Sequence, residues 1–381
     1  MLSTNNLIIE EINPPTLIKL LYITNAIKGA AGLERVLAIK ASYLADKLNY
    51  EVHILVLNHN NDSIFYNFST KIILHDISVT GNPLHYLKTY IKGIQNTIYK
   101  VKPDIISVCD DGLKAFFLPK IINKKIPIVY ERHVSKIIEL GLNPSVFKQI
   151  TSKVKFLAMN YLAKSFDKFI VLTNDNLNEW KGKNVVVISN PLSFYPKESS
   201  TLLNKKVIAV GKQGVQKGYD RLLTSWQIVH KKHPSWQLSI YGSFESSGTL
   251  VAQAKELNIE NSVHFYEPVK NIESKFLESS IFAFSSRFEG FGMVLIEAMA
   301  CGIPCVSFNC SCGPSEIIKN NEDGFLVENG NTTIFADKLL FLIENENQRI
   351  AMGNAAKENV KRYLPENIMP QWDTLFKELL Q

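Results

Sequence analysis

Short apolar runs alternate with longer segments of helical periodicity along most of the chain. The first such unit runs from an apolar stretch at 18–24, through a helix-like pattern at 33–48, to a second apolar stretch at 51–57. Buried strands of a parallel sheet read as continuous apolar runs, and the helices between them have one apolar face. The alternation therefore predicts an α/β fold built on parallel sheets. Further strands are predicted at 105–108, 127–130, 169–173, 206–210, 236–241, 263–266, 281–284 and 304–308.

A polar segment with two prolines divides this alternation into two series. A chain of 381 residues is long for a single core, and the segment 191–205 falls near its middle. We therefore predict two doubly wound, Rossmann-like domains, over 1–190 and 206–364, joined by this linker and facing each other across a cleft. A last helix is expected within 365–381.

The most informative stretch is a glycine-containing turn that follows the predicted strand at 281–284. Gly290 and Gly292 allow the backbone to bend, and 293–300 reads as a helix. A helix N-terminus favours anions, because its free N–H groups and its dipole point toward them. The turn is thus a candidate phosphate site, and the residues expected to bind a donor there are Phe291, Gly292, Met293, Val294 and Leu295.

One carboxylate lies on each side of this turn. Glu297, about one helical turn inside the predicted helix, is placed to reach the hydroxyls of a ribose attached to the bound phosphate. Glu289, before the helix, is placed to accept hydrogen bonds from a sugar on the other side. The arrangement suits a nucleotide sugar.

The ordered string from Ser285 to Ala300, followed by Gly302-Ile-Pro304 and Gly313-Pro-Ser-Glu-Ile-Ile318, resembles the Glu-x7-Glu signature of retaining glycosyltransferase family 4. The resemblance implies the GT-B fold of two Rossmann-like domains, with the helix within 365–381 crossing back to the first domain. It implies transfer of a hexose-type sugar from a UDP-linked donor to an acceptor hydroxyl with retention of configuration. No metal or other cofactor is expected. The expected acceptor is a lipid-linked or surface-polysaccharide glycan.

Two cationic side chains follow the first strand of the second domain. Lys212 and Lys217 lie in a loop at 211–218 and are expected to neutralise a departing nucleoside diphosphate. The loop resembles the Gly-Arg…Gln-Lys-Gly motif of family 4, with Lys212 in place of the arginine.

The first domain contributes two further candidates. The loop at 29–35 resembles the Gly-Gly-x-Glu-Arg loop of family 4, and Gly32 is its candidate for close approach to the diphosphate. His133 follows the strand at 127–130, and its Glu-Arg-His sequence resembles the Glu-His pair of the family. The resemblance places this histidine near the C6 hydroxyl and the anomeric region of the donor sugar. The catalytic candidates are therefore His133, Lys217 and Glu289.

The five cysteines add no metal site to this picture. Four of them crowd together at Cys301, Cys305, Cys310 and Cys312, in a spacing that matches no common structural zinc pattern. We expect them to fill small buried positions, and we expect no metal.

Charge is divided unevenly between the two halves. Residues 1–190 carry 23 Lys and Arg against 15 Asp and Glu, whereas 191–381 carry 19 against 21. Two basic segments contain apolar residues, at 116–125 and at 153–168. The second has a helical stripe, so it is either an interfacial helix at an anionic membrane or a core-packed helix with a lysine-lined solvent face. Its stripe consists of Phe156, Leu157, Tyr161 and Leu162.

Other function classes fit less well. The basic residues form no nucleic-acid motif. No apolar run approaches the roughly 18 to 20 residues of a bilayer span, and 1–15 lacks the basic-then-apolar order of a signal peptide. We therefore expect a cytoplasmic protein, with a contact at the inner face of the membrane left open. A GT-B epimerase or hydrolase, and a non-catalytic nucleotide-sugar-binding subunit, stay as alternatives. A dehydrogenase is disfavoured, because no Gly-x-Gly-x-x-Gly follows a strand.

Overall fold

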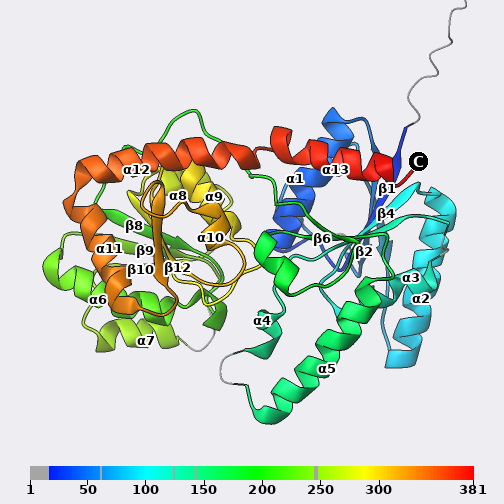
Figure 1. Ribbon diagram of the computed structural model, residues 1–381, viewed down its shortest axis with the longest axis horizontal. Coiled ribbons are helices and arrows are strands. Elements are labelled where there is room, and N and C mark those ends of the chain that lie inside the picture. Colours follow the sequence, from blue (N-terminus) through cyan, green and yellow to red (C-terminus); the bar gives the residue numbers. More distant parts are fainter. Residues whose placement is uncertain (1–16, 61, 123–124, 142–143, 244–247) are drawn as a thin grey trace, which may run out of the picture.

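The computed structural model describes residues 17–60, 62–122, 125–141, 144–243 and 248–381. The segment at 1–15, expected not to be a signal peptide, lies outside these residues. Two parallel sheets stand side by side in Figure 1, each covered by helices on both faces. The first sheet consists of β1 (Lys19–Thr24), β2 (Glu51–Leu57), β3 (Ile73–Ile77), β4 (Ile105–Cys109), β5 (Ile128–Glu131), β6 (Lys168–Val171) and β7 (Val185–Val187). The second consists of β8 (Lys206–Val210), β9 (Gln237–Tyr241), β10 (Val263–Tyr266), β11 (Ile281–Phe284), β12 (Cys305–Asn309) and β13 (Gly324–Glu328).

The first sheet has the strand order β3-β2-β1-β4-β5-β6-β7. Its central strands are buried on both faces, because helices cover each side. One face packs against the helix α1, and the other against α2, η1, α3 and α5. The helices of this half are α1 (Gly32–Lys47), α2 (Pro83–Val101), η1 (Leu113–Phe117), α3 (Leu118–Ile121), α4 (Ile137–Leu140), α5 (Val146–Ala163) and η2 (Asn174–Asn178).

The second sheet repeats this plan with the order β10-β9-β8-β11-β12-β13. The strand order reverses between β8 and β11, as it does between β1 and β4 in the first sheet, and ligands of such sheets bind at these switch points. The helices of this half are η3 (Val215–Lys217), α6 (Tyr219–Lys232), α7 (Thr249–Glu256), α8 (Ile272–Leu277), α9 (Met293–Ala300), α10 (Pro314–Ile317), α11 (Thr332–Glu344), α12 (Glu346–Asn359), η4 (Val360–Tyr363) and α13 (Pro365–Glu378).

The last helix leaves the second half and packs on the first. Figure 1 shows α12 and α13, in orange and red, running along the top of both sheets. Helix α13 contacts α1, and the Tyr50 hydroxyl donates a hydrogen bond of 2.7 Å to Asp373 on α13. One apolar cluster consequently extends from β1 through α13 to α9 of the second half.

Helix α5 differs from its prediction at both ends. The helix begins at Val146, seven residues before the predicted segment at 153–168. It ends at Ala163, and Lys168, the last residue of that segment, is the first residue of β6. The predicted apolar stripe also divides: Phe156 and Leu162 are partly buried, while Leu157 and Tyr161 are exposed. The stripe therefore does not form one buried face. Among the described residues, none of the helices is both long and apolar enough to span a bilayer.

Candidate active site

A cleft of about 770 Å³ separates the two halves at the carboxyl ends of their strands. The loops after β1, β2, β4 and β5 form one wall, and the loops after β8, β9, β10 and β11 form the other. Both switch points therefore open into the same cavity, which is where doubly wound sheets bind their ligands.

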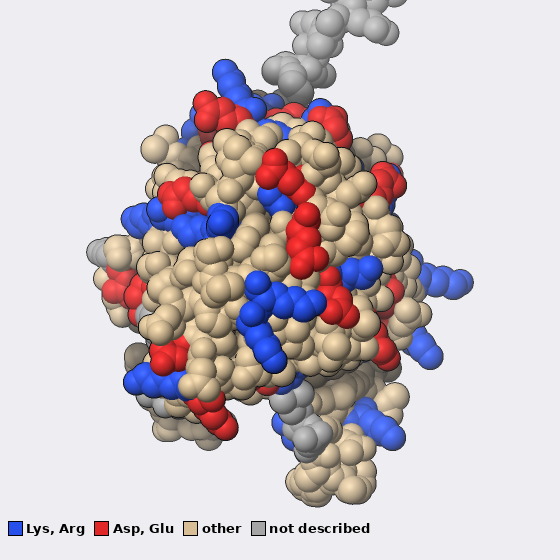
Figure 2. All heavy atoms as spheres, turned by 90° about the vertical axis from the view of Figure 1, so that its left-hand side faces the viewer, with Lys and Arg blue, Asp and Glu red and all other residues tan. Residues whose placement is uncertain are grey.

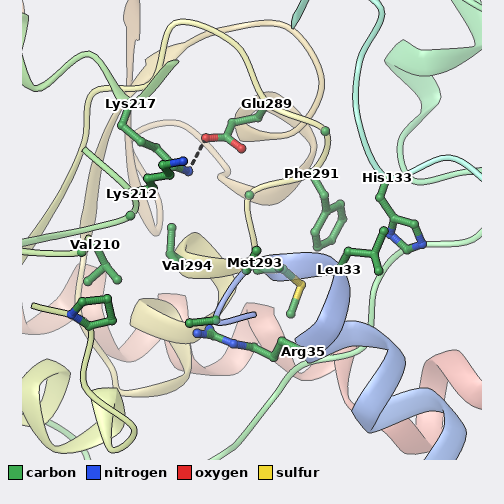
Figure 3. Close-up of a pocket in the computed structure, with 18 of the residues that line it drawn as sticks. Leu33, Arg35, His133, Val210, Lys212, Lys217, Glu289, Phe291, Met293 and Val294 are labelled. Carbon is green, nitrogen blue, oxygen red and sulfur yellow. Dashed lines mark hydrogen bonds and ion pairs between the residues drawn. The ribbon is translucent and has the colours of Figure 1, made fainter. Parts of the chain in front are cut away.

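Lys217 and Glu289 meet on the wall of the second half. The Lys217 ammonium lies 2.6 Å from Oε1 of Glu289, as Figure 3 shows. The same oxygen accepts a 2.7 Å hydrogen bond from the hydroxyl of Ser286. Glu289 is nearly buried, and both charged residues line the cleft. Lys212 also lines the cleft but is exposed to solvent. The fold thus brings to this wall three polar groups that the sequence singled out, Lys212, Lys217 and Glu289.

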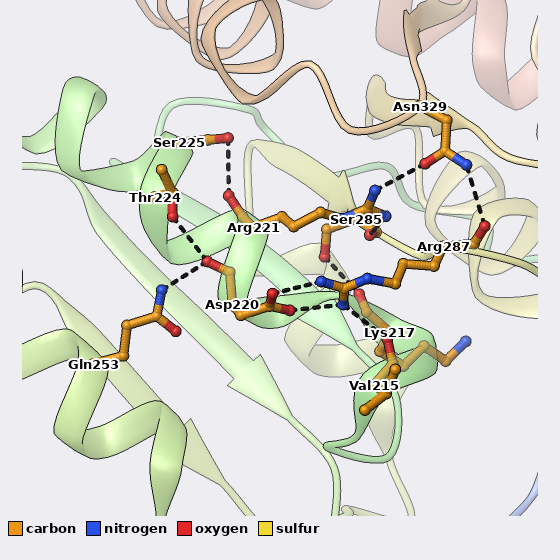
Figure 4. Close-up of polar contacts among 10 residues, drawn as sticks. All are labelled: Val215, Lys217, Asp220, Arg221, Thr224, Ser225, Gln253, Ser285, Arg287 and Asn329. Atoms are coloured by element: carbon orange, nitrogen blue, oxygen red, sulfur yellow. Dashed lines mark hydrogen bonds and ion pairs between the residues drawn. The ribbon is translucent and has the colours of Figure 1, made fainter. Parts of the chain in front are cut away.

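The turn that carries Lys217 is fixed to the strand end that carries Glu289. Arg287 forms a forked pair with both oxygens of Asp220, at 2.7 and 2.5 Å, and donates a hydrogen bond of 2.9 Å to the carbonyl of Val215 (Figure 4). The Ser285 hydroxyl donates a 2.7 Å bond to the carbonyl of Lys217 itself. A bidentate guanidinium fixes direction as well as distance. The lysine is therefore held from two sides.

The N-terminus of α9 forms the adjoining part of this wall. Four of the five residues predicted to bind a donor here line the cleft: Phe291, Gly292, Met293 and Val294. The first N–H groups of a helix have no partner within the helix, so they are available to an anion. The predicted contact Leu295 is buried and lies outside the cleft lining.

Glu297 is also buried behind the wall rather than lining it. Its Oε1 accepts a 2.6 Å hydrogen bond from the Ser193 hydroxyl and forms an ion pair with Arg35 from the first half. Burial alone would lower the pKa of Arg35, but the charge of Glu297 raises it overall. Oε2 of Glu297 is buried and accepts no hydrogen bond from the described residues. One carboxylate oxygen is thus left for a further donor.

The opposite wall begins at the N-terminus of α1. Gly32, the first residue of this helix, lines the cleft together with Leu33. A β-carbon at Gly32 would meet no atom of the chain within 4 Å. The space beside Gly32 is therefore open to a ligand rather than filled by the protein.

His133 faces the cleft on this wall, across from Glu289 in Figure 3. Its Nε2 lies 3.3 Å from Oε2 of Glu131, which also forms an ion pair with the Lys40 ammonium. The Ser107 hydroxyl donates a 2.6 Å hydrogen bond to the other oxygen of Glu131. Burial would raise the pKa of Glu131, but Lys40 and His133 lower it from 4.5 to about 2. A buried carboxylate therefore positions the imidazole.

Sequence reasoning did not single out three residues of this wall: Arg35, Tyr66 and Asp111 all line the cleft. Tyr66 accepts hydrogen bonds of 3.0 and 2.9 Å from Arg35, and Asp111 accepts one of 3.1 Å from the backbone N–H of His133. Asp111 could have been found, because it follows the strand β4 at its carboxyl end. Tyr66 comes from a loop after β2, where the pattern carries no signal.

All five cysteines are buried and free. Among the described residues, one group of potential metal ligands has its atoms close together: Cys109, Glu131 and His133. Burial raises the pKa of the Cys109 thiol, and the Lys40 ammonium already pairs with Glu131. The group is better described as a support for His133 than as a metal centre.

The comparisons with known proteins agree with this geometry. A family model described as glycosyl transferases group 1 matches residues 196–359. A protein of Haemophilus influenzae named as an uncharacterized glycosyltransferase is 31% identical over 359 residues, which are 92% of this chain and 97% of that protein. The chain belongs to the group 1 glycosyl transferases. The amylovoran biosynthesis glycosyltransferase AmsD of Erwinia amylovora is 30% identical over 371 residues, or 94% of this chain and 99% of AmsD.

A solved structure extends the likeness to the whole fold of this glycosyltransferase. A mutant of Staphylococcus aureus TarM, in complex with fondaparinux, alpha-GlcNAc-glycerol and UDP, superposes with a TM-score of 0.78 at 17% identity. The superposition covers 94% of this chain and 100% of that one. The predicted GT-B fold is confirmed.

Proposed function

We propose that this glycosyltransferase is a retaining enzyme of the family 4 type, which transfers a hexose-type sugar from a UDP-linked donor to a hydroxyl of a surface-polysaccharide or lipid-linked glycan. The observation that carries the proposal is the convergence of Lys217, Glu289 and the N-terminus of α9 on one wall, opposite His133. The polysaccharide role in the name of AmsD and the UDP bound to TarM support the acceptor and the donor.

Each residue of the site has its own role in the proposed reaction. The bond between the anomeric carbon and the diphosphate breaks, and its electron pair stays on the phosphate oxygen. Lys217, Lys212 and the N–H groups of α9 offset that charge. The same phosphate oxygen takes the proton of the acceptor hydroxyl, whose oxygen bonds to the anomeric carbon on the face that the leaving group vacated. Glu289 and His133 orient the sugar, and Glu297, buried behind the wall, positions Arg35, which lines the cleft.

Thermal unfolding with UDP, GDP and ADP tests the donor site. A ligand at about 100 times its dissociation constant adds roughly 2.7 kcal/mol to the free energy of unfolding, which raises the melting temperature measurably. We expect a selective shift with UDP that Lys217→Ala reduces. The matched control is Lys232→Ala, at an exposed position on α6 outside the cleft lining.

Product analysis tests the chemistry. Incubation with a UDP-hexose and a glycan acceptor is expected to give a glycoside whose anomeric configuration, read by NMR, equals that of the donor. Inversion would overturn the retaining assignment. Conversion of the UDP-hexose without acceptor would favour an epimerase or hydrolase, and binding without any conversion would favour a non-catalytic subunit.

A further inference from the structure

Four helices that pack on one face of the first sheet contain no acidic residue. Helices α2, η1, α3 and α5, here called the acid-free layer, together carry eight lysines and no Asp or Glu. They form a contiguous layer: the Lys114 ammonium on η1 donates a 3.2 Å hydrogen bond to Tyr86 on α2, and α5 packs against η1. On the opposite face of the same sheet, α1 carries both acidic and basic residues.

Helix α5 also presents an apolar face to the outside. Six large apolar side chains on it are between 57% and 76% exposed. At 100° per residue they fall within one arc of about 100°, the width of a face that is normally buried. On the other side of the helix, Ser152, Met159 and Ala163 are buried against the body of the protein. The exposed face consists of Val146, Phe147, Ile150, Val154, Leu157 and Tyr161.

Helix α2 combines apolar and basic groups in the same way. Leu84 and Tyr99 are 81% and 80% exposed. Lys88 and Lys92 are exposed as well, and helical spacing places them on the same side as these apolar residues. The layer therefore offers apolar side chains and positive charge together.

Among the described residues of the second half, the helices distribute their charges differently. Figure 2 views the molecule from that side and shows acidic and basic residues interspersed. Each of its helices α6, α7, α8, α11 and α12 carries residues of both signs. A contiguous exposed apolar face on a folded protein marks an interaction site.

We propose that the acid-free layer docks on an anionic lipid membrane, with the apolar face of α5 inserted between headgroups and acyl chains and the lysines against the lipid phosphates. Interfacial helices have this composition. A second copy of the chain fits less well, because two acid-free layers would bring lysines against lysines without a partner. An acidic protein would satisfy the charges, whereas a membrane accommodates both the lysines and the broad exposed apolar face of α5.

The docking surface is joined to the cleft. Ile138 on α4 lines the cavity, and α4 packs against α5. Lys136, at the start of α4, donates a 2.8 Å hydrogen bond to Asn160 on α5. Membrane contact through α5 would thus hold the first-half wall of the cleft near the lipid surface. That a lipid-linked acceptor is delivered in this way rests on the proposed function, whereas the docking itself does not.

Co-sedimentation with vesicles tests the docking without reference to catalysis. One set of vesicles contains phosphatidylcholine alone, and the other equal parts phosphatidylcholine and phosphatidylglycerol. We expect binding to the anionic vesicles at low salt and release at high salt, since ions screen the lysines. Replacing Lys88, Lys92 and Lys153 by glutamine is expected to weaken binding by about a hundredfold, given the contribution of each lysine near such a surface.

A triple substitution of Ile150, Val154 and Leu157 by glutamine tests the apolar part. We expect binding to weaken by about a thousandfold or more from the lost burial of three side chains. The matched control replaces the exposed apolar residues Leu203, Val251 and Ile334 of the second half by glutamine. Because all six side chains are exposed, the melting temperatures should stay close to that of the unchanged chain.

Three results would overturn the proposal. The chain could fail to bind anionic vesicles at low salt, it could bind both kinds of vesicle equally, or the control triple could weaken binding as much as the α5 triple does. Light scattering that finds a dimer, dissociated by the α5 triple alone, would assign the face to a second copy instead. If vesicles bind but no sugar transfer is detected with any UDP-hexose, the proposed function fails and the docking stands.

Discussion

The two walls of the cleft hold their polar groups by different means. On the first-half wall, His133 rests on Glu131, which pairs with Lys40 in the interior. The ammonium of Lys40 lies 3.3 Å from the ring centroid of Trp372 on α13, so the last helix also contacts this ion pair. On the second-half wall, the turn that carries Lys217 is held by a more exposed contact, because the side chain of Asp220 in the fork with Arg287 is 46% exposed.

This contrast separates stability from function. A buried ion pair that loses one partner leaves an uncompensated charge in the interior, and the whole fold is destabilised. An exposed pair contributes little to the free energy of unfolding, although it can still order a loop. Substitutions behind His133 should therefore act mainly on folding, and those around Lys217 mainly on turnover.

The largest expected effect is that of Glu131→Gln. We expect a loss of about 3 to 5 kcal/mol in the free energy of unfolding at neutral pH, because Lys40 is left buried without its counter-ion. Urea unfolding followed by circular dichroism measures the loss. The control is Glu278→Gln, which breaks exposed pairs with Lys206 and Lys275 and should cost less than about 1 kcal/mol.

The pH dependence of the free energy of unfolding is a second test of the pair between Glu131 and Lys40. The pKa of Glu131 is lowered from 4.5 to about 2 in the folded state, so its stabilisation is complete above about pH 4.5. Below that value it is lost at roughly 1.4 kcal/mol per pH unit, as the unfolded chain takes up the proton first. The difference in the free energy of unfolding between the unchanged chain and Glu131→Gln should therefore decrease between pH 4.5 and 3. A constant gap would show that the carboxylate is not ionised against Lys40.

On the second-half wall, Lys217→Ala should lower kcat by roughly 100- to 1000-fold, by analogy with the loss of an oxyanion donor. The melting temperature should also fall, but by less than in Glu131→Gln, because the carboxylate of Glu289 that loses its counter-ion lines the open cleft. Steady-state kinetics with a UDP-hexose provide the measurement, and Lys232→Ala is the control. Near-normal turnover of Lys217→Ala would remove its role in stabilising the leaving group.

The sequence predicted the second-half wall better than the first. Glu289, Lys217 and the start of α9 belong to short strings in which a strand, a turn and a helix follow one another, so their placement is local. The strand runs 51–57, 206–210 and 263–266 also match the structure, because buried parallel strands are continuously apolar.

The rest depends on contacts between distant segments. Strand β3 was missed because it is an edge strand with exposed Ile73 and Leu74 and no continuous apolar pattern. Glu297 was placed correctly on its helix, but its pairing with Arg35 joins residues far apart in sequence. The outward-facing stripe of α5 was not predictable, since periodicity shows that a helix has an apolar face but not where that face points.

Gly290 is where the two walls touch, and Gly290→Ala tests how closely they must approach. A β-carbon there would lie 2.0 Å from the carbonyl oxygen of His133, so the backbone segments would have to separate. We expect kcat/KM to fall by about 100-fold, the effect of a misplacement near 1 Å. Gly32→Ala is the comparison, because its methyl group meets no atom of the chain and can obstruct only a ligand. Full activity of Gly290→Ala would mean that the walls need not meet.

The smallest expected effect is that of Asp220→Asn, which removes the charge from the fork with Arg287. The free energy of unfolding should fall by at most about 1 kcal/mol, since the pair is partly exposed. Burial alone would raise the pKa of Asp220, but Arg287 lowers it below its usual value, so the contribution of the pair is present at neutral pH and lost in acid. Amide hydrogen exchange should accelerate in the turn at 213–218, because Arg287 also holds the carbonyl of Val215.

Breaking the exposed pair between Lys361 and Glu358 by Glu358→Gln should leave that exchange unchanged. Equal exchange in both variants would mean that the other hydrogen bonds alone hold Lys217 in place, and that the second-half wall does not depend on its ion pair.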